Sequence, residues 1–185
     1  MMKKAYLASE IPNEKNVAAI IPETAEDGAE CTCILKQNGE SSHYPGWTCH
    51  TIAGIYAERE DKSLPRVGQH CAAVLGASHG SVYPISPDLT FLALKCRQPI
   101  YSSHHRTCAY VNITQPLRII PAANHPEYAA ILFPSGAILP TLWSPKTVRQ
   151  KLNQARLVYL ERINKLRAAL LRAEQNVCKI DELDQ

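Results

Sequence analysis

The segment CTCILKQNGESSHYPGWTCH, residues 31–50, holds the clearest local signal for a fold in this chain. Residues 31–36 read as a strand in which successive side chains point to opposite faces of a sheet. Asn38-Gly39 follows, and this pair fits a two-residue hairpin turn because both positions tolerate a positive φ. The segment therefore predicts a β-hairpin.

Three cysteines of this segment, Cys31, Cys33 and Cys49, could either fill a core or bind a metal. Structural zinc usually takes pairs of close ligands, with two to four residues inside each pair. Cys31 and Cys33 are one residue apart on a strand, which places their Cα atoms about 6.5 Å from each other. Free cysteine is also among the most buried residue types. We therefore expect core-facing thiols, with a zinc site as the alternative, and we predict no metal ligand.

Short apolar runs on either side of the hairpin extend the same pattern. The runs end at Pro, Gly, Ser or Asn and begin at residues 17, 47, 70, 89, 108, 117, 128 and 136. Short runs with such punctuation favour a mostly β domain. The alanine-rich runs at 70–77 and 125–132 could be helical instead, because periodicity does not decide at that length.

The sequence thus predicts an α+β fold, in which a compact β-rich domain, a small barrel or sandwich, occupies residues 17–143. A loose N-terminal arm, residues 1–16, precedes the domain. A helix of residues 144–177 and an acidic tail of residues 178–185 follow it.

The helix prediction rests on a change of composition after Trp143. Ser144 is a good N-cap, Pro145 is a good first helical residue, and no glycine or further proline follows. A helix from there to Val177 would be roughly 48 Å long, which is longer than a domain of this size needs.

Two apolar stripes run along this helix. One follows Val148 to Val177 in steps of three and four, and the second lies nearly opposite. A helix packed only on its own domain shows one stripe, so two stripes indicate a second surface to bury. A 4-4 step at Ala155, Tyr159 and Ile163 argues against a long regular coiled coil. The expected interface residues are Leu152, Tyr159, Ile163, Leu166, Leu170, Leu157, Leu160 and Leu171.

Basic residues lie between the two stripes. Residues 146–172 contain eight basic residues and one acid, and the last thirteen residues carry a net charge of −3. Intrahelical ion pairs cannot balance this excess. The basic side chains are either a solvated face or a contact for a polyanion such as nucleic acid. For a polyanion, the candidate contacts are Arg149, Arg156, Arg162, Lys165 and Arg167.

Two patterns suggest a nucleophile, and neither is complete. Residues 76–80 read G-x-S-x-G around Ser78, but Pro84 and Pro87 forbid the helix that should follow a nucleophile elbow. Cys71 follows His70, and Cys108 lies near a histidine pair, yet sequence neighbours do not give the geometry of a Cys-His pair. Phosphate-binding glycine loops and His-Glu-x-x-His are absent from the sequence, so we predict no catalytic residue and no cofactor.

The chain has 185 residues, a net charge of +3 and seven cysteines, and shows neither a signal peptide nor an apolar run long enough for a membrane span. These features favour a reduced, cytoplasmic protein with no membrane partner. We expect a non-enzymatic interaction protein that forms a homo-oligomer or binds a partner protein through its C-terminal helix. Accessory proteins of viruses or mobile elements often have this plan. The alternatives are a nucleic-acid-binding regulator and a small serine or cysteine hydrolase.

Overall fold

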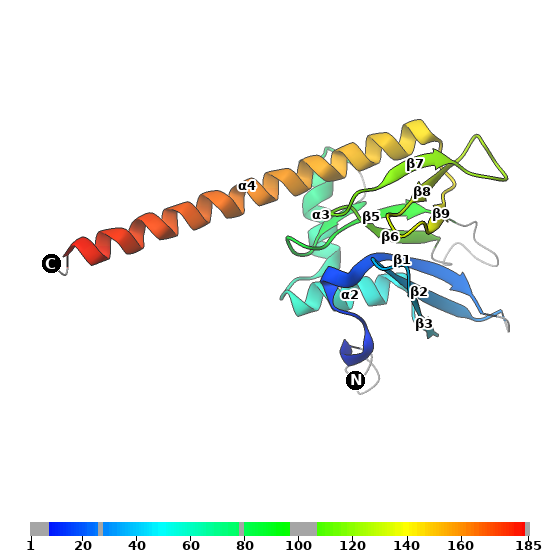
Figure 1. The fold of residues 1–185 in the computed structure, drawn as a ribbon, viewed down its shortest axis with the longest axis horizontal. Coiled ribbons are helices and arrows are strands. Elements are labelled where there is room, and N and C mark those ends of the chain that lie inside the picture. The colour runs from blue at the N-terminus through cyan, green and yellow to red at the C-terminus, as the bar shows by residue number, and fades with distance from the viewer. Residues whose placement is uncertain (1–7, 26–27, 78–79, 97–106, 184–185) are drawn as a thin grey trace.

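A computed structural model describes residues 8–25, 28–77, 80–96 and 107–183 of the chain, with side chains described as far as Gln175. The fold is α+β and rich in strands: two antiparallel sheets and two helices form a domain, and a long C-terminal helix follows (Figure 1). The predicted fold class is confirmed.

The larger sheet has six strands in the order β3-β2-β1-β6-β5-β4. Its strands are β1 (Val17–Thr24), β2 (Glu30–Lys36), β3 (Ser41–Pro45), β4 (Val82–Pro84), β5 (Thr90–Lys95) and β6 (Cys108–Asn112). A 3-10 turn, η1 (Glu14–Asn16), leads into β1. The smaller sheet has the order β7-β8-β9, with β7 (Arg118–Pro121), β8 (Ala129–Leu132) and β9 (Ile138–Pro140). Each sheet is open at its edges in the described residues, so the strands form a sandwich and not a closed barrel.

The predicted hairpin is present as β2 and β3. The turn differs from the expected two-residue form, because Gly39 has a φ of +92° whereas Asn38 does not have a positive φ. The Lys36 amide donates to the Glu40 carbonyl at 2.8 Å, so residues 37–39 form the loop. The expected alternation also holds, because Ile34 packs in the cluster beneath the helices whereas Leu35 packs in the cluster between the sheets. Strand β2 is therefore buried on both faces.

Two helices cover one face of the larger sheet: α2 (Cys49–Arg59) and α3 (Leu64–Val74). The strand expected from residue 47 was wrong, because this segment forms α2. Thr48 caps the helix by accepting from the Thr51 amide at 3.2 Å. Its buried side chains recur at helical spacing, and Ile52 and Tyr56 are completely covered. Tertiary burial of this face outweighs the strand propensity of its isoleucines and threonines.

The run expected from residue 70 also belongs to a helix, since it starts inside α3. The other ambiguous run, residues 125–132, contains β8. In the cluster beneath the helices, Tyr56 meets Phe91 edge-on with ring centroids 6.1 Å apart, and Phe91 meets Tyr110 with centroids 5.9 Å apart. These aromatic contacts fix α2 on the sheet.

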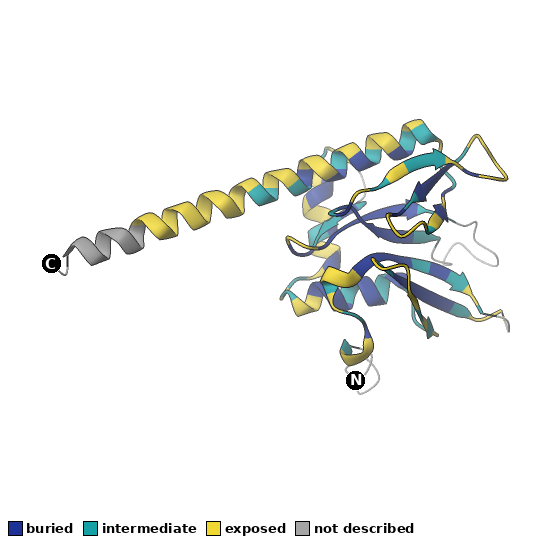
Figure 2. Cartoon of the chain, viewed as in Figure 1, coloured by how far each residue is buried: buried dark blue, intermediate teal, exposed yellow. Residues whose placement is uncertain are grey.

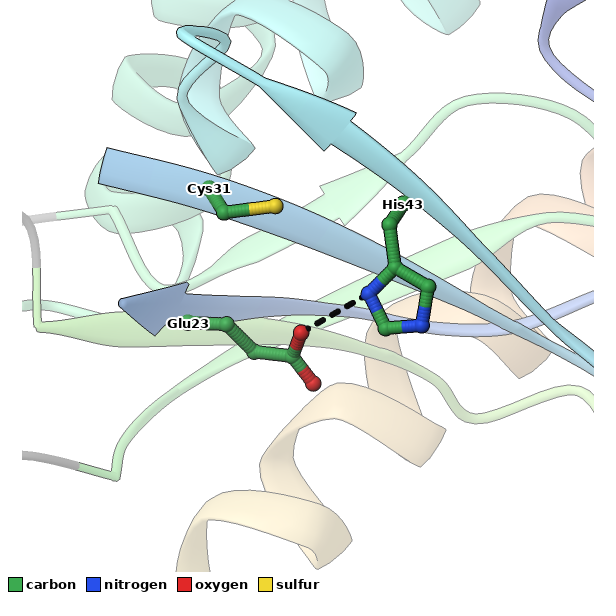
Figure 3. A group of neighbouring side chains, drawn as sticks. All are labelled: Glu23, Cys31 and His43. Carbon is green, nitrogen blue, oxygen red and sulfur yellow. Dashed lines mark hydrogen bonds and ion pairs between the residues drawn. The ribbon is translucent and has the colours of Figure 1, made fainter. Parts of the chain in front are cut away.

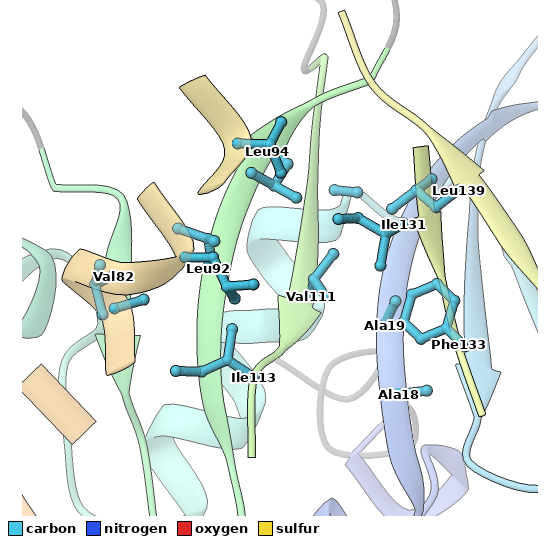
Figure 4. Packing of buried hydrophobic residues seen from close by; sticks show 14 of the residues in the cluster. Ala18, Ala19, Val82, Leu92, Leu94, Val111, Ile113, Ile131, Phe133 and Leu139 are labelled. Atoms are coloured by element: carbon cyan, nitrogen blue, oxygen red, sulfur yellow. The ribbon is translucent and has the colours of Figure 1, made fainter. Parts of the chain in front are cut away.

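The other face of the larger sheet packs against the smaller sheet. Leu92 and Leu94 of β5 and Val111 of β6 approach Ile131, Phe133 and Leu139, which lie in or beside β8 and β9 (Figure 4). The first turns of the C-terminal helix close this cluster. The core is thus shared by both sheets and one helix.

The expected loose arm is described from Ala8 onward. There Ile11 is 4% exposed, the Tyr56 hydroxyl donates to the Pro12 carbonyl at 2.9 Å, and the Arg59 guanidinium donates to the carbonyls of Ala8, Ile11 and Pro12. Residues 8–16 are therefore held against α2.

Candidate interaction surface

The C-terminal helix α4 (Pro145–Leu183) has 39 residues, a length of about 58 Å. It starts where the sequence predicts, with the Thr147 amide donating to the Ser144 hydroxyl at 3.3 Å. It continues past Val177, so it includes most of the segment expected as a tail. Figure 1 shows that only its first half lies along the domain and that the rest projects away.

The first half of α4 is part of the core. Val148 and Ala155 are fully buried, and Leu152 and Val158 are nearly so. The Lys151 ammonium also lies over the Trp143 ring, 4.9 Å from its centroid. Leu152 was expected at an interface, but in this structure its partner is the chain's own β-rich domain.

Arg162 marks the point where α4 leaves the domain. Its guanidinium donates to the Pro84 carbonyl and, at 3.1 Å, to the Ile85 carbonyl at the end of β4. The Lys62 ammonium donates to the same Ile85 carbonyl. Burial, together with the nearby Arg162 charge, lowers the pKa of Lys62. The side chains of Arg162 and Lys62 thus bind the backbone just after β4, and we call this contact the clasp. Arg162 therefore has a structural role that the sequence did not indicate.

Beyond the clasp every residue from 164 to 175 is exposed (Figure 2). Among them are Leu166, Leu170 and Leu171, with exposed fractions of 45%, 61% and 58%. Leu157 and Leu160, on the side of α4 away from the domain, are exposed as well. Tyr159 and Ile163 are half-buried beside the core. We call residues 164–183 the projecting segment.

The irregular spacing seen in the sequence coincides with this departure. The 4-4 step falls at Ala155, Tyr159 and Ile163, where the apolar stripe changes from core contact to projection. From Tyr159 onward the steps are regular, alternating four and three through Ile163, Leu166, Leu170, Ala173 and Val177. An alternation of this kind is the pattern of helices that pair with other helices.

Most basic residues of α4 are exposed. Arg149 and Arg156 lie on the first half, and Arg167 and Arg172 lie on the projecting segment. In the described residues, α4 has one ion pair, in which the Lys165 ammonium lies 2.6 Å from the Glu161 carboxylate. That contact lowers the pKa of Glu161. The excess positive charge of the helix therefore faces solvent.

A cavity of about 380 Å³ adjoins the clasp between α3, β4 and α4. Its lining includes the cationic side chains of Lys62, Arg66 and Arg162, together with His70. No acidic residue lines it in the described part of the chain. The cavity therefore brings the positive charges of Lys62 and Arg66 beside Arg162 of α4.

The candidate nucleophiles find little support. Ser78 lies outside the described residues, but α3 precedes it and β4 follows it, which is the reverse of the strand-turn-helix order of a nucleophile elbow. Cys71 is 2% exposed, and burial raises the pKa of its thiol. Burial also raises the pKa of Cys108. A protonated thiol is a poor nucleophile.

Comparison of the chain with protein-family models, curated proteins and solved structures finds no match. In the described residues, no helix combines the length and apolar character that crossing a membrane requires. The geometry of α4 and of the side chains around it is therefore the basis for a functional proposal.

Proposed function

We propose that this protein self-associates through the projecting segment of α4, and that the partner helix belongs to a second copy of the chain. The observation that carries the proposal is the exposure of Leu166 and Leu170, which lie on one stripe of a helix that has left its domain. Most helical stability in proteins comes from packing of an apolar face, and the projecting segment has no such packing on its own domain. Burial of an exposed leucine contributes about 1.5–3 kcal/mol, so pairing would stabilise the segment.

Charge supports a second copy in antiparallel orientation. Residues 162–172 carry Arg162, Lys165, Arg167 and Arg172 without an acid, and residues 174–184 carry four acids and one lysine. Antiparallel pairing centred near Ala173 places the basic stretch of one helix beside the acidic stretch of the other. Opposite charges that flank an apolar seam set the orientation of helix pairs. A parallel pair would instead place like charges side by side.

The test compares the molar mass of three forms of the protein by light scattering over a concentration series. The forms are the full chain, a truncation after Ile163, and the variant Leu166→Glu/Leu170→Glu. We expect the full chain to be a dimer and the other two to be monomers. The control variant Val74→Glu/Ile138→Glu alters two exposed apolar residues away from the projecting segment. We expect it to remain a dimer.

A monomeric full chain at every concentration would overturn the proposal. So would a dimer that survives both the truncation and the leucine substitutions, because its interface would then lie on the domain. Truncation after Ile163 leaves the buried side chains of Val148, Leu152 and Ala155 in place, so the core of the domain is kept.

Nucleic-acid binding is the second candidate, and the exposed basic side chains of α4 favour it. Arg149 and Arg156 are exposed on one side of α4, and neither has an acid three or four residues away in the helix. The cavity lies beside Arg162, on the other flank of the helix, and adds the charges of Lys62 and Arg66. Phosphate contacts made by such residues give an affinity that falls steeply as salt rises.

Fluorescence anisotropy with a labelled DNA duplex tests this second candidate. We expect the variant Arg149→Gln/Arg156→Gln to bind more weakly and with a shallower salt dependence than the unchanged protein. The control Lys15→Gln/Lys36→Gln, on the N-terminal side of the domain, should bind unchanged. Arg162 is left intact because it holds α4 on the domain. Binding that does not respond to salt, or to the arginine substitutions, would refute the candidate.

A further inference from the structure

Three side chains able to ligate a metal converge on one face of β1, β2 and β3 (Figure 3). They are Glu23, Cys31 and His43, and one ligand atom of each lies within 4.8 Å of the other two. We propose that these three residues bind a zinc ion. The site lies on the larger sheet and does not depend on the function proposed for α4.

The register of the strands creates this arrangement. Glu23 of β1 is directly opposite Cys31 of β2, and Cys33 is directly opposite His43 of β3. Cys31 and Cys33 share a face because they are two residues apart on a strand, so His43 is a diagonal neighbour of Cys31 on that face. Diagonal neighbours are within reach of ring-bearing side chains. The three ligands therefore come from paired strands, which hold them more firmly than loops would.

The histidine ring is held between two polar side chains of the site. Its Nδ1 atom lies 2.9 Å from the Glu23 carboxylate, and its Nε2 atom lies 3.3 Å from the Ser41 hydroxyl. Without metal, Nδ1 carries the proton and donates it to the Glu23 carboxylate, since a carboxylate only accepts. Ligation through Nδ1 uses the other neutral tautomer, in which Nε2 carries the proton and donates to the Ser41 hydroxyl. Metal-bound histidines usually donate their second ring N–H to such a neighbour, which fixes the tautomer and the ring plane.

The thiol of Cys31 has no strong competing interaction among those described. Its hydrogen bond to the Thr32 carbonyl is 3.9 Å long, which is weak even for sulfur. Figure 3 shows the sulfur directed toward the imidazole of His43. Cys31 is 6% exposed, whereas Glu23 and His43 have side-chain exposures of 38% and 53%. The site thus has a buried sulfur side and a solvent side.

The donor set selects the metal. Zinc binds sulfur at about 2.3 Å and nitrogen or oxygen at about 2.0–2.2 Å, so tetrahedral ligand atoms are about 3.3–3.6 Å apart. In the structure the His43 Nδ1 atom and the Glu23 oxygen are 2.9 Å apart, and all three ligand atoms lie within 4.8 Å of one another, so side-chain rotations of about an ångström would bring them to these separations. A mixture of thiolate, imidazole and carboxylate suits zinc and excludes magnesium or calcium, which prefer oxygen ligands alone. Three protein ligands leave a fourth position for water or another donor.

Zinc binding at this site is a ligand exchange, in which protein atoms replace water molecules on the ion. The zinc ion gives up three water molecules, and Cys31 releases its thiol proton to solvent. The Nδ1 proton of His43 passes to solvent while Nε2 takes a proton from solvent, so the imidazole stays neutral and the net release is the one thiol proton. The freed Nδ1 lone pair and a Glu23 oxygen then bind the metal. The sequence argument against zinc concerned Cys31 and Cys33 as a ligand pair. The structure replaces Cys33 with two ligands from neighbouring strands, which that argument did not cover.

Cobalt provides the test, because a thiolate ligand gives Co²⁺ a charge-transfer absorption that oxygen and nitrogen ligands do not. The full chain, reduced and stripped of metal with a chelator, is titrated with CoCl₂ and then with ZnCl₂. We expect one equivalent to bind with the thiolate band, and zinc to displace the cobalt. Cys31→Ser should abolish the band, and His43→Ala should weaken binding about 100-fold or more. Ser41→Ala should weaken it about tenfold.

Two matched controls separate the site from other thiols and imidazoles. Cys49→Ser removes a buried thiol that belongs to the cluster on the helix side of the sheet. His125→Ala removes a histidine whose Nδ1 lies 3.3 Å from the Glu127 carboxylate, in an exposed His-Glu pair. Both should bind cobalt as the unchanged chain does.

A full chain that binds no cobalt with a thiolate band overturns the proposal. A band that persists in Cys31→Ser, or that is lost equally in Cys49→Ser, overturns it as well, because the metal then lies elsewhere. If Cys31→Ser does not fold, as judged by circular dichroism, the partly exposed His43→Ala variant decides. Retention of full affinity by that variant refutes the site.

Discussion

Arg162 anchors α4 to the domain at the point where the helix begins to project, since its guanidinium donates to two backbone carbonyls at the end of β4. Hydrogen bonds to charged groups contribute more to stability than neutral ones do. We expect Arg162→Ala to lower the free energy of unfolding by about 1–2 kcal/mol, because the side chain is only half-buried. Urea unfolding measures the change. Arg156→Ala, on an exposed position of the same helix, is the control, and equal losses in both variants would contradict the role of the clasp.

Two glycines predict opposite effects of the same substitution. A Cβ atom at Gly80 would lie 2.5 Å from the Gly68 carbonyl oxygen, so Gly80→Ala forces α3 away from its neighbour. Overpacking of this kind costs about 1–3 kcal/mol. At Gly54, inside α2, a Cβ atom would meet nothing within 4 Å. Gly54→Ala should therefore stabilise the protein by about 0.5–1 kcal/mol.

Thermal unfolding of both glycine variants checks these signs. A destabilised Gly54→Ala or a stabilised Gly80→Ala would show that the packing of α2 or α3 differs from that described.

Cys33 predicts a pH dependence of stability. Burial, with the neighbouring Glu23 carboxylate, raises the pKa of its thiol from 9.0 to about 12. Between these values the folded chain keeps a proton that the unfolded chain loses, so the free energy of unfolding falls as pH rises above 9. Urea midpoints measured with a chelator between pH 8 and pH 11 should show this fall. The fall should be smaller in Cys33→Ala, and identical slopes would refute the assignment.

At the scale of secondary-structure elements, the two N-caps of α2 and α3 provide a matched pair. Thr48 accepts a hydrogen bond from the Thr51 amide, whereas Ser63 makes no capping hydrogen bond with its side chain. Removal of a working cap costs about 1 kcal/mol. We expect Thr48→Ala to lower the melting temperature clearly and Ser63→Ala to leave it nearly unchanged. A reversed order would show that the cap does not hold α2.

The sequence predicted those elements whose signals are local. Asn38-Gly39 determines a turn within four residues, and the absence of glycine and proline after Pro145 is enough to predict α4. The segment that forms α2 was misassigned, although Thr48 and the helical spacing of Cys49, Ile52 and Tyr56 were visible in it. That spacing acquires meaning only when the sheet beneath the helix is known.

The candidate sites were predictable only in part, for the same reason. The exposed leucines of α4 could be identified from periodicity, but the residue at which the helix leaves the domain depends on where β4 ends. The cluster of Glu23, Cys31 and His43 requires the pairing of β1 with β2 as well as the hairpin register. The hairpin alone places Cys33, and not Cys31, opposite His43.

At the scale of the whole molecule, the two halves of α4 predict different effects of truncation. Removal of residues 164–185 takes away a stretch that is exposed from 164 to 175, so the domain should keep its unfolding free energy. Removal of everything after Ser144 uncovers the core beneath Val148, Leu152 and Ala155. This second truncation should lower stability by several kcal/mol, since Leu-to-Ala changes alone cost about 2–5 kcal/mol each.

Denaturation of both truncated forms at low protein concentration, where self-association does not contribute, measures this difference. Equal stability of the two truncated forms would show that α4 does not belong to the core.

The continuity of α4 gives a dimer a fixed internal dimension. Nothing in the helix after Pro145 can bend it sharply, because it holds neither glycine nor proline. From Asn164 to Leu183 the helix advances about 30 Å. An antiparallel pair would therefore give an elongated dimer, with a β-rich domain (a head) at each end of a straight two-helix segment. Its heads would be about as far apart as one turn of B-form DNA, roughly 34 Å. The length of the helix would then set the distance between the two β-rich domains, and each added or deleted turn would change that distance by about 5.4 Å.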